Sequence, residues 1–206
     1  MSKTVSVVIS TLMKRPNDLA KCLEALAKQT IPPDEIIVLK DNFGGVCTTR
    51  NYGIGMSGCD IIAFTDDDCI PSPGWIEHIK INFENTPNLC ALSGKVYGGL
   101  NTTDKKVFFG ANMAFDRYIL SDFNFDVNFN PQNHEELDLI WTMMDVNEAC
   151  ENGWIFKHDD NVIVHHPNPG GSGVDHWSKA RSRNTELLKK KHSVRFAILE
   201  KEDRVL

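Results

Sequence analysis

The sequence predicts an α/β fold: one domain whose mostly parallel central sheet is flanked by helices. The chain has 206 residues, which is the length of one ordinary domain. Apolar residues make up 41% of it and charged residues 24%, as is usual for globular proteins. Short β-branched apolar runs at 5–11, 35–39 and 60–65 alternate with segments of helical spacing. This β-α-β-α-β order implies parallel strands joined by right-handed crossovers.

The first half of the chain alternates regularly between strands and helices. Leu19, Cys22, Leu23 and Leu26 recur at the spacing of a helix face, and the continuous apolar runs are typical of strands buried on both faces. The expected elements, in order, are a strand at 5–11, a helix that begins within 15–18 and ends at 31–33, a strand at 35–39, a short helix at 48–56, a strand at 60–65 and a helix from 73 to about 83.

Three polar loops follow the three expected parallel strands, at 11–17, 40–45 and 66–74. The carboxyl ends of parallel strands share one edge of a sheet, and ligands bind in the crevice beyond that edge. The pattern therefore predicts one ligand site formed by these loops.

The second half has more loops and is expected to be mixed. Its expected elements are a strand at 89–97, a strand within 106–115, a loop at 123–133, a helix at 134–152, short strands at 154–157 and 161–164, a glycine-rich loop at 169–173 and a basic amphipathic helix at 176–192. The basic helix is interpreted as a solvated face, with contact to an anionic membrane as the alternative.

Charge and cysteine content exclude several classes of protein. Twenty-two basic residues stand against 28 acidic ones, a net charge of −6, which argues against nucleic-acid binding. The six cysteines include no pair at CxxC spacing, so we expect free thiols in a reducing cytosol rather than a zinc or redox site. No apolar run reaches the ~20 residues of a membrane span, and the first residues lack a signal peptide's pattern. We expect a cytoplasmic protein. Peripheral contact with the inner face of a membrane through the basic helix is the alternative to a fully solvated helix.

Three consecutive acids, Asp66, Asp67 and Asp68, follow directly after an apolar strand. Adjacent carboxylates repel one another, so the run requires either a bound cation or a solvated turn. Hard divalent ions take oxygen ligands, and Mg²⁺ commonly combines one or two carboxylates with substrate phosphates. Taken alone, the run leaves both interpretations open.

A series of short motifs runs along nearly the whole chain. It includes VSVVIST at 5–11, TRNYG at 49–53, the acidic run after 61–65, PGWI at 73–76, GANMAF at 110–115, EELDL at 135–139, VIVHH at 162–166 and RSRN at 181–184. In their order and spacing these motifs resemble a family-2 glycosyltransferase of the GT-A fold. The resemblance implies a GT-A-like single domain at 1–206, with a nucleotide-sugar-binding half at about 1–98 and an acceptor-binding and catalytic-base half at about 99–206.

The resemblance implies that a nucleoside-diphosphate sugar is the donor. Thr11 and Asp41 would line the base pocket, where Asp41 suits a uracil imide, so a UDP-sugar is preferred over GDP- and TDP-sugars. Arg50 would lie near the base or the diphosphate. Trp75 would stack on the acceptor, which is a glycan, a lipid-linked molecule or a protein.

The acidic run would be the DxD motif of this family. Asp66 and Asp67 would contact the nucleotide sugar, with Asp66 facing both the ribose and the metal. Asp68 would bind Mn²⁺ or Mg²⁺ at the diphosphate. His165 or His166 would be a further metal or diphosphate contact, and histidine suits Mn²⁺ better than Mg²⁺.

Most family members invert the anomeric centre and use a carboxylate as general base. In this chain Glu136 is the first candidate, Glu135 the second, and Asp138 the further acid of the same motif. The segment departs from the family, because its helix is longer and lacks the usual arginine. Asp145 in the role of base is therefore an alternative.

Two other functions remain open from the sequence. A nucleotidyltransferase on a related scaffold is disfavoured, because residues 11–16 after the first strand contain no glycine. A binding module that keeps the nucleotide site without a functional base would explain the unusual segment at 135–153.

Overall fold

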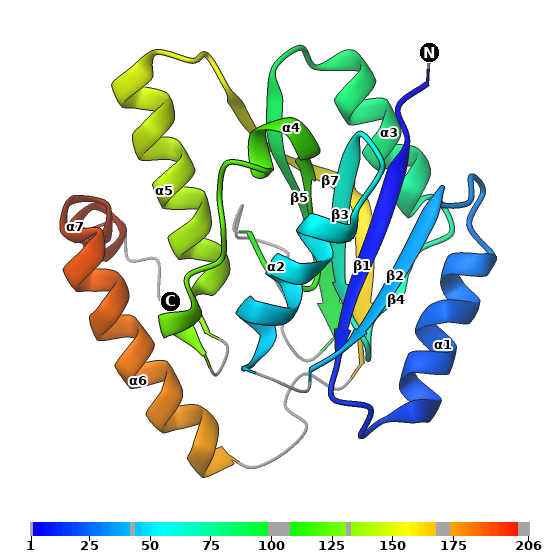
Figure 1. Cartoon of the computed structure of the whole chain (residues 1–206), viewed down its shortest axis with the longest axis horizontal. Coiled ribbons are helices and arrows are strands. Elements are labelled where there is room, and N and C mark those ends of the chain that lie inside the picture. The colour runs from blue at the N-terminus through cyan, green and yellow to red at the C-terminus, as the bar shows by residue number, and fades with distance from the viewer. Residues whose placement is uncertain (1, 42–43, 99–107, 131–132, 168–173, 202–206) are drawn as a thin grey trace.

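The computed structural model describes residues 2–41, 44–98, 108–130, 133–167 and 174–201 (Figure 1). The glycine-rich loop expected at 169–173 and the first residues of the segment at 106–115 lie outside this part. The strands are β1 (Val5–Thr11), β2 (Glu35–Lys40), β3 (Ile61–Asp66), β4 (Ile70–Pro71), β5 (Leu89–Gly98), β6 (Met113–Asp116) and β7 (Ile155–His166). The helices are α1 (Pro16–Ala27), α2 (Val46–Met56), α3 (Trp75–Asn85), α4 (Arg117–Leu120), the 3₁₀ turn η1 (Val127–Phe129), α5 (Glu135–Cys150), α6 (Val174–Lys191) and α7 (Ser193–Lys201).

These strands form one sheet in the order β2-β1-β3-β6-β5-β7-β4. The pairs β1–β2, β1–β3 and β5–β7 are parallel. In contrast, β6 and β4 run against their neighbours. The expected α/β fold with a mostly parallel sheet and a mixed second half is confirmed. The carboxyl ends of β1, β2, β3, β5 and β7 all meet one edge of this sheet.

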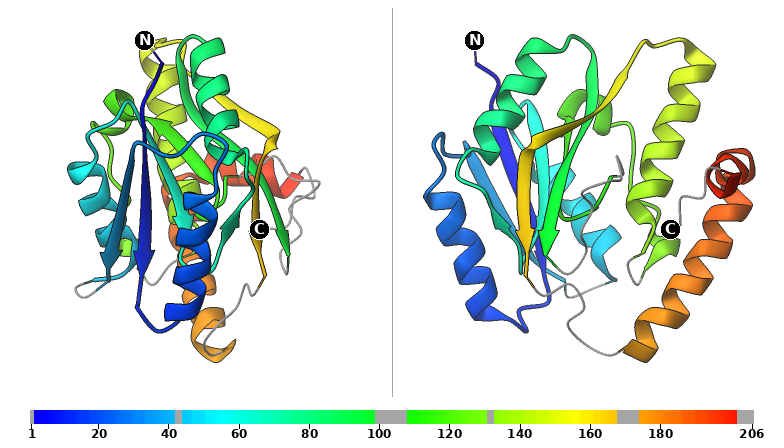
Figure 2. Two further views of the ribbon diagram at one scale, coloured as in Figure 1. Left: turned by 90° about the vertical axis from the view of Figure 1, so that its right-hand side faces the viewer. Right: turned by 180° about the vertical axis from the view of Figure 1, so that it is seen from behind.

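Helices cover both faces of the sheet (Figure 2). Alternate residues of β1 explain the two layers, because successive side chains of a strand point to opposite faces. Val7 and Ile9 pack with α1 and α3 in one apolar cluster. Val8 belongs to a second cluster on the other face, with residues of α2, α5, α6 and α7.

Four details differ from the expectations. Strand β2 is an edge strand, so Ile36 and Val38 are about 40% exposed (41% and 38%) rather than buried on both faces. The two short strands expected at 154–157 and 161–164 form the single strand β7, with an irregularity opposite Gly94 and Lys95. The short strand β4 lies within the loop expected at 66–74, and α7 is an additional helix.

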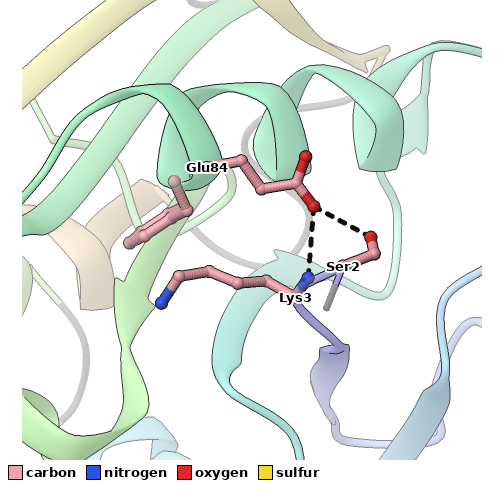
Figure 3. A pocket seen from close by; sticks show the side chains of 4 residues that line it. Ser2, Lys3 and Glu84 are labelled. Atoms are coloured by element: carbon pink, nitrogen blue, oxygen red, sulfur yellow. Dashed lines mark hydrogen bonds between the residues drawn. The ribbon is translucent and has the colours of Figure 1, made fainter.

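A pocket near the N-terminus lies at the amino end of β1, away from the edge at which the parallel strands end. It is lined by Ser2, Lys3, Phe83 and Glu84, and Glu84 accepts hydrogen bonds from Ser2 Oγ and the Lys3 backbone N–H (Figure 3). In the described residues, no helix combines the length and the apolar character that a membrane crossing requires.

Candidate active site

The short strand β4 decides where the acidic run lies. Ile70 of β4 pairs with His165 of β7, and Pro71 pairs with Val164. The chain therefore leaves β3 at Asp66 and within a few residues forms β4, the strand that lies beside β7 at one edge of the sheet. As a result, the acidic run lies beside the carboxyl end of β7.

Asp68 and His166 meet at this point. His166 Nε2 lies 3.0 Å from Asp68 Oδ1. The Asp68 side chain is 4% exposed. Burial alone would raise the pKa of Asp68, but the hydrogen bond and charge of His166, together with the charge of Arg15, outweigh it and lower that pKa. Burial likewise would lower the pKa of His166, and Asp68 and Asp66 more than offset this, so the pKa of the imidazole is raised.

Four side chains offer metal-ligand atoms that all lie within 4.8 Å of one another: Asp66, Asp68, Cys69 and His166. Two carboxylates and an imidazole are a donor set that Mn²⁺ accepts, whereas a thiolate suits softer ions. Burial raises the pKa of the Cys69 thiol well above its usual range, so this group is a neutral thiol. The residues fit a Mn²⁺-like ion held by Asp66, Asp68 and His166.

The two adjacent histidines of β7 differ in position. His165 is exposed and His166 is half-buried, because neighbouring residues of a strand point to opposite faces. Of the two sequence candidates, the structure brings His166 to the acidic run, and His165 lies outside the group of metal-ligand side chains found in the described residues.

Arg50 connects the acidic run to the candidate base region. Its Nη1 donates to Glu135 Oε1 at 2.7 Å, and its Nη2 donates to Asp66 Oδ1 at 3.3 Å. The guanidinium is buried and lies over the Phe125 ring, 5.4 Å from its centroid. Burial would lower the pKa of Arg50, but the neighbouring carboxylates raise it, so the group is a permanent cation. In this structure it contacts the carboxylates of Glu135 and Asp66, and its place near the base or the diphosphate stays a prediction.

The two glutamates at the start of α5 are not equivalent. Glu135 is buried, and its second oxygen, Oε2, accepts from the Asn133 backbone N–H at 2.7 Å. Glu136 is half-buried. Burial and the adjacent Glu135 carboxylate raise the pKa of Glu136 well above its usual range. A carboxylate whose pKa lies closer to neutral pH is a more effective general base there.

Thr11 and Asp41 lie next to each other at the ends of β1 and β2. The Asp41 backbone N–H donates to the Thr11 carbonyl at 2.8 Å, and Asp41 Oδ1 accepts from the Gly45 N–H. Thr11 Oγ1 donates to Asp67 Oδ2 at 2.5 Å. Asp67 is therefore held within the protein by Thr11, while Asp41 lies at the rim in a half-buried position.

Two of the expected site residues lie elsewhere. Trp75 is fully buried, and its indole N–H donates to Asn112 Oδ1 at 2.9 Å. In this structure Trp75 is a core residue with no face open to an acceptor. Asp138 is also buried and faces the C-terminal helices, where its carboxylate lies 2.9 Å from His192 Nε2 and 2.8 Å from Lys191 Nζ.

The alternative base Asp145 also lies away from the acidic run. Its carboxylate is 2.6 Å from Arg195 Nε and 3.4 Å from His192 Nδ1, and its side chain is 53% exposed. Asp138 and Asp145 thus hold α6 and α7 against α5.

Sequence reasoning missed one residue of this region, Arg15. It lies in the turn after β1 and pairs with both Asp67 and Asp68. A single arginine before a proline matches no sequence motif. Its position in one of the three loops at the carboxyl edge was the feature that could have identified it as a site residue.

Comparison with known proteins agrees with this geometry. Residues 42–134, which include Arg50 and the acidic run, match the sequence model described as glycosyl transferase family 2. The predicted resemblance to family-2 glycosyltransferases is confirmed. A curated relative is the glucosyl-dolichyl phosphate glucuronosyltransferase of Haloferax volcanii, which is 30% identical over 118 residues. This match covers 45% of the chain and only 38% of the relative.

Solved glycosyltransferase structures share the fold. Glucosyl-3-phosphoglycerate synthase from Mycobacterium tuberculosis, in complex with Mn²⁺, UDP and phosphoglyceric acid, matches with a TM-score of 0.68 and 15% identity, over 92% of this chain and 78% of that one. A mannosyltransferase from Pyrobaculum calidifontis, in complex with GDP-Man and Mn²⁺, matches with a TM-score of 0.64 and 13% identity, over 87% of this chain and 61% of that one. The GT-A fold class is therefore established.

Proposed function

We propose that this protein is a metal-dependent glycosyltransferase that moves a sugar from a nucleoside-diphosphate sugar to an acceptor hydroxyl with inversion. One observation carries the proposal: Asp66, Asp68 and His166 converge at the carboxyl edge of the sheet. Arg50 joins Asp66 to Glu135 at the start of α5. The cation-binding group and the candidate base region therefore form one site.

The donor is proposed to lie along the carboxyl edge between β2 and β7. Asp41 at the rim accepts from the imide N–H of a uracil, beside Thr11. Asp66, Asp68 and His166 hold Mn²⁺ or Mg²⁺. When bound, this ion supplies Lewis-acid stabilisation of the negative charge on the departing diphosphate. A UDP-sugar is supported by the UDP in the mycobacterial relative, and the GDP-Man of the other solved structure makes GDP the competing carrier.

Glu136 is proposed as the general base, with Glu135 as its partner. The buried Arg50 neutralises Glu135, while the half-buried Glu136 has a raised pKa and can take the proton of the acceptor hydroxyl as its oxygen attacks the anomeric carbon. Such a base contributes about 10²–10⁴-fold to the rate.

The acceptor is proposed to be a lipid-linked glycan, in which a sugar hydroxyl is the nucleophile. The name of the Haloferax relative refers to a dolichyl phosphate substrate. The exposed basic residues of α6, including Arg183, Lys189 and Lys190, offer a surface that would attract an anionic membrane. We therefore propose that the enzyme works at the cytoplasmic face of a membrane.

A thermal-shift screen tests the donor site. UDP, GDP, TDP and CMP are each added with and without Mn²⁺. A ligand at 100 times its Kd stabilises the native state by about 2.7 kcal/mol, which raises Tm by several degrees at this chain length. We expect one diphosphate to stabilise the protein only with Mn²⁺, and Asp68→Asn to abolish this.

The two histidines provide a matched comparison for the same screen. His166→Ala is expected to weaken Mn²⁺ binding at least about tenfold, while His165→Ala leaves it unchanged. Equal effects of both variants, or no metal-dependent stabilisation at all, would overturn the site.

Turnover then separates an enzyme from a binding module. Release of UDP from UDP-sugars is measured with a glycosyl polyprenyl phosphate, whose sugar hydroxyls can act as the acceptor. Glu136→Gln should keep metal-dependent UDP binding and lose about 10²–10⁴-fold in kcat. Binding without turnover of any donor in the wild-type protein would favour a non-catalytic module.

A further inference from the structure

Arg15 covers the acidic run from the solvent side. It is the residue before α1, in the turn that follows β1. Its Nη2 lies 3.1 Å from Asp67 Oδ1, and its Nη1 contacts Asp68 Oδ2. The Arg15 side chain is 37% exposed, whereas those of Asp67 and Asp68 are only 8% and 4% exposed. One guanidinium thus bridges two adjacent carboxylates and shields both from water.

Every oxygen of these two carboxylates has a partner. Asp68 uses Oδ1 for His166 and Oδ2 for Arg15. Asp67 uses Oδ1 for Arg15 and Oδ2 for Thr11. In this arrangement a protein cation already offsets the charge of the acidic run, so the carboxylates are satisfied without a metal ion.

A divalent ion on Asp68 would share that carboxylate with the Arg15 guanidinium. Like charges a few ångströms apart in a partly buried site repel strongly. The arrangement therefore opposes binding of the metal alone. A diphosphate changes this balance, because its negative charge attracts both cations. A guanidinium matches phosphate oxygens in the same forked geometry that it uses for carboxylates.

We propose that Arg15 is a donor-binding residue that pairs with Asp67 and Asp68 in the free protein and transfers to the donor diphosphate when the metal binds. This inference rests on the proposed function and adds to it how the site is filled. Metal and nucleotide then bind together rather than independently. Because such coupling is reciprocal, each ligand raises the affinity for the other by the same factor.

The test measures Mn²⁺ binding itself, by the loss of the electron paramagnetic resonance signal of free Mn²⁺. Titrations are run on the full chain with and without saturating UDP, and with GDP as a second probe. In the wild-type protein, we expect the nucleotide to tighten Mn²⁺ binding at least about tenfold. In Arg15→Gln, we expect Mn²⁺ alone to bind about tenfold tighter than in the wild type, and the coupling to the nucleotide to fall to a few-fold.

Lys14→Gln is the matched control. Lys14 is the neighbouring residue, is exposed, and makes no ion pair with any described residue, so this variant changes the net charge by the same amount without touching the acidic run. Its Mn²⁺ affinity and coupling should stay within about twofold of the wild type. Arg15→Lys retains a positive charge but lacks the forked guanidinium. This variant replaces Arg15→Gln in the test if Arg15→Gln does not fold. It should bind Mn²⁺ alone more tightly than the wild type, by a smaller factor.

The outcomes separate this inference from the proposed function. Unchanged or weaker Mn²⁺ binding in the Arg15 variants, alongside strong coupling in the wild type, overturns the role of Arg15 and leaves the transferase proposal standing. If Lys14→Gln tightens Mn²⁺ binding as much as Arg15→Gln does, the effect is due to net charge alone, and the proposed role of Arg15 is overturned. Failure of the wild-type protein to bind Mn²⁺ with either nucleotide overturns both.

Discussion

Arg50 Nη1 lies 2.7 Å from Glu135 Oε1, and each of these side chains is only 5% exposed, although the residues are 85 positions apart. The same guanidinium reaches Asp66. The acidic run at the end of β3 and the glutamates at the start of α5 therefore share one buried cation. Their separation is fixed by a side chain of α2, a helix that itself packs against β1 and β2.

Removal of Arg50 is expected to be strongly destabilising. Arg50→Met leaves Glu135 buried without a counter-charge, a change that typically costs about 3–5 kcal/mol. Urea unfolding followed by circular dichroism measures the loss. Lys21→Met, which breaks the exposed pair with Asp18, is the control and should have no measurable effect. A loss as small as that of the control would mean that the Arg50–Glu135 pair contributes nothing.

Glu136 should make stability depend on pH in a defined direction. Its pKa is raised in the folded state, so the unfolded chain, with a pKa of about 4.3, releases its proton first. The free energy of unfolding therefore falls as pH rises from that value to the folded pKa, by at most about 1.4 kcal/mol per unit. Glu136→Gln does not titrate and should gain stability relative to the wild type between pH 5 and pH 8. A stability difference that is the same at both pH values would contradict the raised pKa.

Asp138 is expected to act in docking the C-terminal helices and not in chemistry. Asp138→Ala removes the shared partner of Lys191 and His192 and should cost about 1.5–3 kcal/mol. Metal-dependent UDP binding should be retained, while limited proteolysis should release α6 and α7 faster. Asp145→Ala, on the exposed side of His192, should have a smaller effect. Loss of turnover in Asp138→Ala at unchanged stability would instead return Asp138 to a catalytic role.

Two glycines of α2 should respond to alanine in opposite directions. A Cβ at Gly53 would overlap Cγ1 of Val8, which is 1% exposed in the core, and such overpacking costs about 1–3 kcal/mol. A Cβ at Gly55 meets nothing within 4 Å, so Gly55→Ala should stabilise the helix by up to about 1 kcal/mol. Thermal unfolding of the two variants measures both effects. If Gly53→Ala is as stable as Gly55→Ala, then α2 does not pack closely on β1.

The regular part of the fold was predictable because its signals are local. The largely apolar, β-branched run at 5–11 coincides with β1, since a strand buried on both faces has a nearly continuous run of such residues rather than an alternation with polar ones. The strand order placed the polar loops at one edge before any motif was considered. Asp66 and Asp68, predicted as metal candidates, lie there with His166. Their metal-binding role remains a prediction.

The structure differs from the sequence-based expectations at features that have no local sequence pattern. The two residues of β4 are too few for a periodicity, yet their pairing with β7 determines which histidine reaches Asp68. Arg15 pairs with residues more than 50 positions away. The family resemblance implies that Trp75 contacts the acceptor, but in the structure its indole N–H is buried and donates to Asn112. None of these partners can be inferred from neighbouring residues in the chain.

The pairing of β4 with β7 also has a consequence for how the protein is made. Ile70 emerges from the ribosome long before His165, its partner in the sheet. During synthesis the acidic run therefore cannot take its place beside β7 until the residues of β7 have also emerged. Contacts between residues so distant in sequence form late, because the intervening chain must first be ordered. We therefore expect the ability to bind a metal to be among the last properties that the nascent chain acquires.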